Sequence, residues 1–499
     1  MNPIEFMRLK PRISHSPTID TYELKSRMDL KMQQHRPYFI VASVEVGNTT
    51  TKCILMAVNL KEGKSYLVNK TVKMTRDVRP PKGDEEVFGY TLNRVPLTRN
   101  AVSELVRDTL LECFYSVNLD IKKDLNFVVR STGVVAGFRT EEEIGNIIKA
   151  LADGCLFAGV PPRAMTSAFS IDNIGAAFKP YSLIEKINFD GAVGGVTPPK
   201  GATGVELVAN EMEGELATAG LKEGAKWAGV DYRNPCLSLD FGTTLDGRIT
   251  NANLPYAKTI GNFCGLAGAI PDALVRGTKL VDGNVGVALD VINEKPAGNI
   301  TLMRKSRVIE EYAERIHKYI IIETVPSGRD HYGTIPVNPE VAKVLDVTLI
   351  GCDIGHDGSD LPKLAEIGGE IYKKYDLNIL SAILDVTMAK LVQRLVKLAL
   401  DQHLINRDTA IGVTGRAGIT CNKPKIILKY IKELGIYDNS EENVVFVDDG
   451  LARGAAVMAR CMNLLGTPKT PIGGNRGGRC VLGARIKHEK ELRQASQVR

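Results

Sequence analysis

The stretch VEVGNTTTKCI (residues 44–54) lies between two apolar runs, at 38–42 and 53–58. Apolar, β-branched runs on either side of Gly-Asn predict two strands joined by a tight turn. The turn also carries what a phosphate-binding loop needs, because glycine lets backbone N–H groups approach a ligand and threonine hydroxyls add donors. The stretch therefore fits two interpretations, an ordinary hairpin or a turn built around a phosphate group.

A second stretch, LDFGTTLDGRI (239–249), repeats the order of apolar residue, acid, apolar residue, glycine and threonine. It also follows a strand-like run, at 235–239. The two glycines, Gly47 and Gly242, are 195 residues apart, which is far longer than the period of a solenoid repeat. This spacing predicts two similar domains, each of which opens with the same hairpin.

Composition limits the class of protein. At 499 residues, with 44% hydrophobic and 24% charged residues, the chain is a globular protein of more than one domain. A net charge of +6 is small for this length, so no nucleic-acid partner is expected. The N-terminus is polar and no apolar run approaches a membrane span, so we expect a cytoplasmic protein without a membrane partner.

The nine cysteines include no CxxC pair, which favours free thiols. An iron–sulfur cluster built from distant cysteines, or shared across a homodimer, is the alternative. The loop 351–360 gathers Cys352, His356 and three aspartates, and it fits either a polar turn or a metal site.

The expected domain boundaries follow from shifts in pattern along the chain. Residues 1–36 are polar and proline-containing and predict a mobile or docking N-terminal arm, so the folded body is expected to begin near Pro37. We expect a first domain at 37–230, a second at 231–470 with an inserted segment at about 275–345, and a basic C-terminal tail at 471–499. Apolar periodicity predicts helices at 100–115, 308–322, 380–403 and 424–434, and a strand at 444–447.

Two turns from opposing domains can together hold a nucleoside triphosphate and its magnesium ion. The acids, Glu45 and Asp240, are the candidate metal ligands and catalytic residues. The candidate nucleotide-binding residues of the two turns are Gly47, Asn48, Thr49, Thr50 and Lys52 on one side, and Gly242, Thr243 and Thr244 on the other. A third element, Thr414-Gly415-Arg416, ends a predicted strand, and its arginine can stack on a base or pair with a ribose or phosphate.

These three elements, followed by Asp448-Asp449 and a small-residue helix, resemble the superfamily of actin, sugar kinases, acetate kinase and heat-shock chaperones. The resemblance implies an α/β fold of two ribonuclease-H-like domains that face each other across a nucleotide cleft. It also implies that ATP and Mg²⁺ are cofactors and that Asp240 orients the attacking water. Glu45 departs from the usual aspartate, and its extra methylene moves the carboxylate outward.

At the level of the whole chain, the opening segment PRISHSPTIDTYELKSR (11–27) and the length resemble the methanogenesis marker protein 14 family of methanogenic archaea. This resemblance implies an ATPase that activates or assembles a metalloenzyme of methanogenesis, its protein partner. Two alternatives remain open: a small-molecule kinase or ATP-dependent hydrolase, and a structural or binding protein of the same fold that does not hydrolyse ATP.

Overall fold

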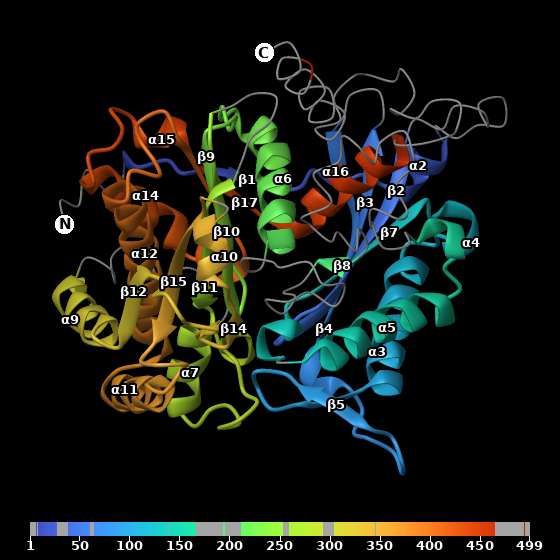
Figure 1. The fold of residues 1–499 in the computed structure, drawn as a ribbon, viewed down its shortest axis with the longest axis horizontal. Helices are drawn as coiled ribbons and strands as arrows, with labels where there is room; N and C mark the ends of the chain where they lie inside the picture. Colours follow the sequence, from blue (N-terminus) through green and yellow to red (C-terminus); the bar gives the residue numbers. More distant parts are fainter. Residues whose placement is uncertain are drawn as a thin grey trace.

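The structure is a computed structural model that describes Phe6, Gln494 and residues 8–26, 38–59, 64–138, 140–165, 193–194, 211–252, 259–292, 304–344 and 346–464. Two halves, each with its own sheet, lie side by side in Figure 1. The predicted tail at 471–499 lies outside these residues, apart from Gln494.

The first half is built on a five-stranded sheet of order β4-β3-β2-β7-β8. Strands β2, β3 and β4 form an antiparallel meander, and β7 and β8 continue the sheet in parallel. The strands are β2 (Tyr38–Val46), β3 (Thr50–Asn59), β4 (Lys64–Met74), β7 (Phe127–Thr132) and β8 (Val193–Gly194). The other elements of this half are η2 (Thr75–Asp77), β5 (Val87–Tyr90), β6 (Pro96–Thr98), α3 (Arg99–Tyr115), α4 (Ile121–Asp124), η3 (Val134–Gly137), α5 (Glu141–Phe157) and η4 (Pro162–Ala164).

The second half repeats this topology in an eight-stranded sheet of order β1-β17-β16-β9-β10-β11-β15-β12. Strands β9, β10 and β11 form the antiparallel meander, and β16 and β17 continue it in parallel from β9. The strands are β9 (Cys236–Phe241), β10 (Thr244–Thr250), β11 (Thr259–Leu266), β12 (Ile320–Thr324), β15 (Thr348–Ile354), β16 (Ala410–Thr414), β17 (Val444–Val447) and β1 (Arg12–Ser14).

The remaining elements of the second half are α7 (Ala269–Gly277), η7 (Ala288–Asp290), α9 (Ser306–His317), β13 (His331–Tyr332), β14 (Ile335–Pro336), α10 (Pro339–Val344), α11 (Leu361–Lys374), α12 (Leu377–Asp401), α13 (Arg416–Ile419), α14 (Lys423–Glu433) and α15 (Ser440–Asn443). The segment expected as an insertion, 275–345, contributes β12 to the sheet and α9 to its helical cover. Because both sheets repeat one strand order, the predicted pair of ribonuclease-H-like, actin-like domains is confirmed.

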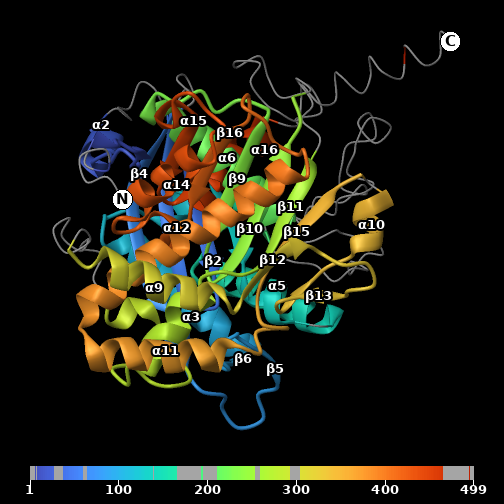
Figure 2. The same cartoon turned by 90° about the vertical axis from the view of Figure 1, so that its left-hand side faces the viewer.

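Two long helices, α6 (Glu211–Ala228) and α16 (Gly450–Leu464), lie between the halves (Figure 1). Figure 2 shows the second half from its outer side, where α9, α11 and α12 lie. The outer face of the first sheet is covered by α3 and α5, and its inner face by four alanines of α16. The second sheet is covered by α12 and α14 on one face and by α6 on the other. Helix α16 follows β17 of the second sheet and packs on the first, so it crosses between the halves.

Two sequence predictions were wrong. The folded body does not begin near Pro37, because β1 precedes it and pairs in parallel with β17, so the described part of the N-terminal arm is docked. The helix expected at 308–322 ends at His317, and Ile320–Thr324 forms β12 against β15. The β-branched run Ile320-Ile321-Ile322 favours a strand once a partner strand is beside it.

Candidate functional site

The two motif acids point toward each other's half of the molecule. In β2, Val44 and Val46 pack into the core under α3 and α5, so the alternation of a strand turns Glu45 to the face that α16 covers. In β9, Leu239 and Phe241 pack into the core with α12, so Asp240 faces α6. Both carboxylates therefore lie on the inner faces of their sheets.

The two predicted turns meet between the halves. The hydroxyl of Thr49, in the β2–β3 turn, lies 2.9 Å from the hydroxyl of Thr243, in the β9–β10 turn. The first turn is closed by the Gly47 N–H, which donates to the Thr50 carbonyl at 3.0 Å. Thr75, which directly follows β4, also fixes this turn, because its hydroxyl donates to the Gly47 carbonyl at 2.8 Å. Residues 194 positions apart thus share one hydrogen bond at the interface of the halves.

Acidic side chains are concentrated around Asp240. Burial raises the pKa of Asp240 to about 7, with smaller contributions from the charges of Glu213 and Glu45, and Lys52 opposes the shift. Burial likewise raises the pKa of Asp246 well above its usual value, and Glu213 adds to the shift. Asp246 is the cross-strand partner of Asp240, and one of its buried oxygens, Oδ1, has no hydrogen-bond partner. The site therefore favours a positive charge.

Sequence reasoning missed Glu213 and Asp246 as members of this cluster. Asp246 lies inside the second motif and, six residues after Asp240, it returns to the same face of the hairpin, so strand alternation could have identified it. Glu213 comes from the first turn of α6 and reaches the site only because that helix crosses onto β9 and β10. Its position depends on tertiary packing, for which the local sequence carries no signal.

Two basic side chains lie beside the acids. Lys52 Nζ is 3.2 Å from Glu45 Oε2 across the β2–β3 pair. Burial is the largest influence on Lys52 and works to lower its pKa, but the charges of Glu45 and Asp240 outweigh it and the net pKa is raised. The positive charge of Arg416 also acts on Lys52, so the two cations face the same region. Arg416 therefore adds a second positive charge near Lys52 and the acids.

Other predicted residues serve the framework of the site. The Asn48 amide donates to the Gly133 carbonyl at 2.8 Å and accepts from the Leu92 N–H at 2.8 Å. Thr50 is buried beside it. The Thr244 hydroxyl donates to Asp246 at 3.3 Å. The Thr414 hydroxyl accepts from the Gly450 N–H at 3.2 Å, at the start of α16.

The position of Gly415, directly after β16, requires a glycine for two structural reasons. Its φ is 81°, a conformation that side chains rarely adopt. A Cβ there would lie 2.4 Å from Asp240 Oδ1 and 2.4 Å from the Phe241 carbonyl oxygen. Glycine therefore lets the third motif contact the second. Around Gly242, in contrast, a Cβ would make only ordinary contacts, the nearest at 3.6 Å.

Of the predicted loop 351–360, residues 351–354 belong to β15 and residues 355–360 form a polar turn. The Asp353 carboxylate accepts from the N–H groups of Ile354, Asp357 and Gly358, at 2.7, 2.7 and 3.1 Å, and so closes the loop on itself. Within the described part of the chain, no group of three or more His, Cys, Asp or Glu side chains has a metal-binding arrangement. Cys352 is buried and donates to the Leu266 carbonyl.

Among the described helices, none is both long enough and apolar enough to cross a lipid bilayer.

Comparison with known proteins adds relatives in archaea. A protein of Methanocaldococcus jannaschii is 56% identical over 484 residues, covering 97% of this chain and 96% of that protein. A protein of Methanothermobacter thermautotrophicus is 54% identical over 451 residues, covering 90% and 83%. Both carry only the name uncharacterized protein.

Among solved structures, a reductive activator for a corrinoid, iron–sulfur protein aligns with 92% of this chain at 13% identity and a TM-score of 0.36. This chain spans 63% of that activator, less than two thirds of its length. Residues 38–489 match the family described as "Uncharacterized protein conserved in archaea (DUF2114)". This match covers most of the sequence, and the chain belongs to that archaeal family.

Proposed function

We propose that this protein binds Mg-ATP between its two halves and hydrolyses it, and that the resulting change in the angle between the halves acts on a protein partner. One observation carries the proposal: two turns of the same design, one from each half, touch through Thr49 and Thr243 at 2.9 Å. An ordinary hairpin turn has no reason to meet its counterpart in another domain. A ligand that bridges the two turns would couple its own state to the domain angle.

The residues present suit a magnesium ion brought by the nucleotide. Mg²⁺ is usually held by one or two carboxylates together with phosphate oxygens and waters, so a complete protein cage is unnecessary. Asp240 and Glu45 would supply the carboxylates. Burial and, to a smaller extent, the charges of Glu213 and Glu45 raise the pKa of Asp240, and a bound cation would oppose that shift. When bound, the ion would neutralise charge on the phosphates.

The protein's own groups divide the remaining work. Lys52 and Arg416 would balance the charge of the phosphates, while the N–H groups and hydroxyls of the two turns would position them. Asp240 would orient the attacking water. Positioning and charge stabilisation are the main terms in phosphoryl transfer, so loss of Asp240 is expected to reduce turnover more than loss of either threonine.

Calorimetry with Mg-ATP, followed by phosphate release from the same samples, tests the proposal. We expect the wild type to bind and turn over ATP, and Asp240→Asn to lose at least about a hundredfold in turnover. Asp438→Asn, an exposed aspartate far along the chain, is the matched control and should behave as the wild type. A wild type without affinity for Mg-ATP would contradict the proposal and return VEVGNTTTKCI to an ordinary hairpin.

A second candidate is a protein that binds ATP without hydrolysing it. The Lys52–Glu45 ion pair favours this alternative, because it occupies one oxygen of the acid that departs from the superfamily's aspartate. Replacing Glu45 by Asp separates the two candidates. Turnover that appears only in Glu45→Asp supports the binding protein, and turnover already present in the wild type rules it out.

For the partner, we propose a metalloenzyme of methanogenesis. Support comes from the resemblance to the methanogenesis marker family and from relatives in Methanocaldococcus and Methanothermobacter. The expected result is phosphate release that rises when an inactive methanogenic metalloenzyme is added. Turnover that instead requires a small-molecule acceptor would indicate a kinase.

A further inference from the structure

The N-terminal segment at 8–24, called the strap here, joins both halves of the molecule. Its first part belongs to the second half, where β1 extends the sheet with Arg12, Ile13 and Ser14 opposite Val445, Phe446 and Val447. Leu9 packs into the core of that half, and the Lys10 N–H donates to Glu441 at 3.0 Å. Strand β1 is thereby fixed to the strand that leads into α16.

The second part of the strap belongs to the first half. The Leu67 N–H donates to the Pro17 carbonyl at 2.7 Å, and the Ile19 N–H donates to the Leu67 carbonyl at 3.0 Å, so Thr18 pairs with β4. Ile19 and Leu24, the latter in α2 (Thr21–Ser26), are buried against Tyr38, Ile40 and Ala57. The strap therefore supplies the edge strand of the second sheet, β1, and pairs with the edge strand of the first, β4.

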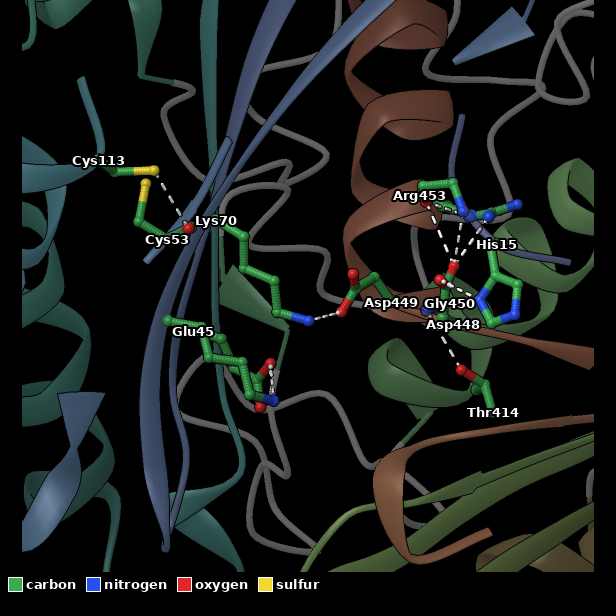
Figure 3. A network of polar contacts seen from close by, with 12 residues as sticks. His15, Glu45, Cys53, Lys70, Cys113, Thr414, Asp448, Asp449, Gly450 and Arg453 are labelled. Carbon is green, nitrogen blue, oxygen red and sulfur yellow. Dashed lines mark hydrogen bonds and ion pairs between the residues drawn. The ribbon is translucent and has the colours of Figure 1, made fainter. Parts of the chain in front are cut away.

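Between these parts, Asp448 and Arg453 bind the strap at the start of the crossing helix (Figure 3). Asp448 accepts from the Ser16 N–H at 2.9 Å and lies 3.1 Å from the ring of His15. Arg453, 1% exposed, donates to Asp448 at 2.8 Å and to the hydroxyls of Ser16 and Ser14 at 2.8 and 3.0 Å. An arginine this deeply buried is stable only with such partners.

A further ion pair lies beside this network. Lys70 of β4 pairs with Asp449, in the connection from β17 to α16 (Figure 3). The strap and this ion pair thus both connect the region of β17 in the second sheet with β4 of the first. Helix α16, which follows β17, packs mainly on β2, β3 and β7 of the first sheet.

Chain length sets how far the strap lets the halves move. Ser14 is paired in the second sheet and Thr18 is paired with the first, so four residue steps separate the two attachments. A fully extended chain spans at most about 3.6 Å per residue, or about 14 Å for this segment. The edges of the two sheets cannot separate further unless one attachment breaks.

We propose that the strap is a conformational tether, which limits rotation of the two halves about the crossing helices and keeps the interface at the two turns closed without any ligand. Residues 11–27, on which the resemblance to the methanogenesis marker family was based, thereby gain a physical role. This role does not depend on nucleotide binding, because its contacts are all within the chain.

Hydrogen exchange and small-angle scattering on the full chain without nucleotide test the tether. In the variant Ile19→Ser with Leu24→Ser, we expect amides of the turn at 46–51 to exchange about tenfold faster and the radius of gyration to rise. Tyr22→Ser is the matched control, because Tyr22 lies on the same helix and is 80% exposed. The control should match the wild type in both measurements.

A cross-linked variant gives the opposite perturbation and guards against simple unfolding. Thr18→Cys with Leu67→Cys joins two bridged backbone partners, and we expect slower exchange at 46–51 that reverses when the bond is reduced. If the loosened variant changes only the amides of the strap and of β4, and the cross-link leaves 46–51 unchanged, the strap is a packing element and the proposal is wrong.

Discussion

His317, the last residue of α9, shows how a single buried side chain sets a pH limit on stability. The residue is 7% exposed, its Nε2 donates to the Thr387 carbonyl at 3.0 Å, and its Nδ1 accepts from Arg394 at 3.1 Å. Because the arginine can only donate, the neutral ring with its proton on Nε2 is the form that fits. Burial, followed by the charge of Arg394, lowers the pKa of His317 to about 4.

The sign of the pH dependence follows from this lowered pKa. The unfolded chain takes up a proton near pH 6.5 but the folded protein does so only near pH 4, so His317 destabilises the fold as pH falls through this window. We expect a loss of about 1.4 kcal/mol per pH unit relative to His317→Gln, which keeps one donor and one acceptor without titrating. Urea unfolding of both proteins at pH 7 and pH 5 measures the difference. Equal losses in the two proteins would contradict the prediction.

At the scale of elements, α6 and α16 pack closely because glycines face backbone at their crossing. A Cβ on Gly220 would lie 1.8 Å from the Gly450 carbonyl oxygen, and one on Gly454 would lie 1.9 Å from the Leu216 carbonyl oxygen. Both contacts are with backbone, which cannot move aside as a side chain can. The crossing that brings Glu213 to Asp240 therefore depends on these two glycines.

The substitution Gly220→Ala tests this packing. We expect it to lower the free energy of unfolding by about 1–3 kcal/mol, the usual range for overpacking, because the helices must separate. Gly145→Ala in α5 is the matched control, since a Cβ there meets nothing within 4 Å and alanine is the better helix former. The control should be neutral or stabilising by up to about 1 kcal/mol. Similar effects of both changes on urea unfolding would show that the crossing tolerates a side chain.

Elements with a strong local pattern were predictable from sequence. The strand at 444–447 and the pair of hairpins follow from local residues, and the structure contains each of them. The prediction that the folded body begins near Pro37 failed because β1 depends on a distant partner. This strand is three residues long and forms only because β17 offers an edge. Glu213 was missed because it reaches the site through a helix crossing. The hydrogen bonds of Asn48 with Gly133 and Leu92 likewise join segments far apart in the sequence, so no local pattern could predict them.

At the scale of the whole molecule, the halves are also joined at the α7 end of their interface, opposite β1 in Figure 1. Arg76 of η2 donates two hydrogen bonds to Asp290 of η7, at 2.7 and 2.6 Å. Arg276 of α7 donates to Asn93 at 2.6 Å. The strap holds one end of the interface and these polar contacts hold the other, so they differ in their response to salt.

Loss of the Arg76–Asp290 pair should let this end open. A bidentate ion pair with side chains 27% and 22% exposed stabilises the closed arrangement by about 1 kcal/mol. Arg76→Ala should therefore raise the population of the open arrangement about fivefold. Small-angle scattering should show a larger radius of gyration for Arg76→Ala at low salt. Arg107→Ala, which removes an ion pair within α3, is the control and should leave the radius unchanged.

Salt gives a second test of the same ion pair. In about 1 M salt, where charges are screened beyond about 3 Å, the radius of gyration of the wild type should approach that of Arg76→Ala. If the wild type is as compact at high salt as at low salt, and Arg76→Ala is equally compact, the prediction is wrong. Other contacts, such as the Arg276–Asn93 hydrogen bond, would then be enough to close this end.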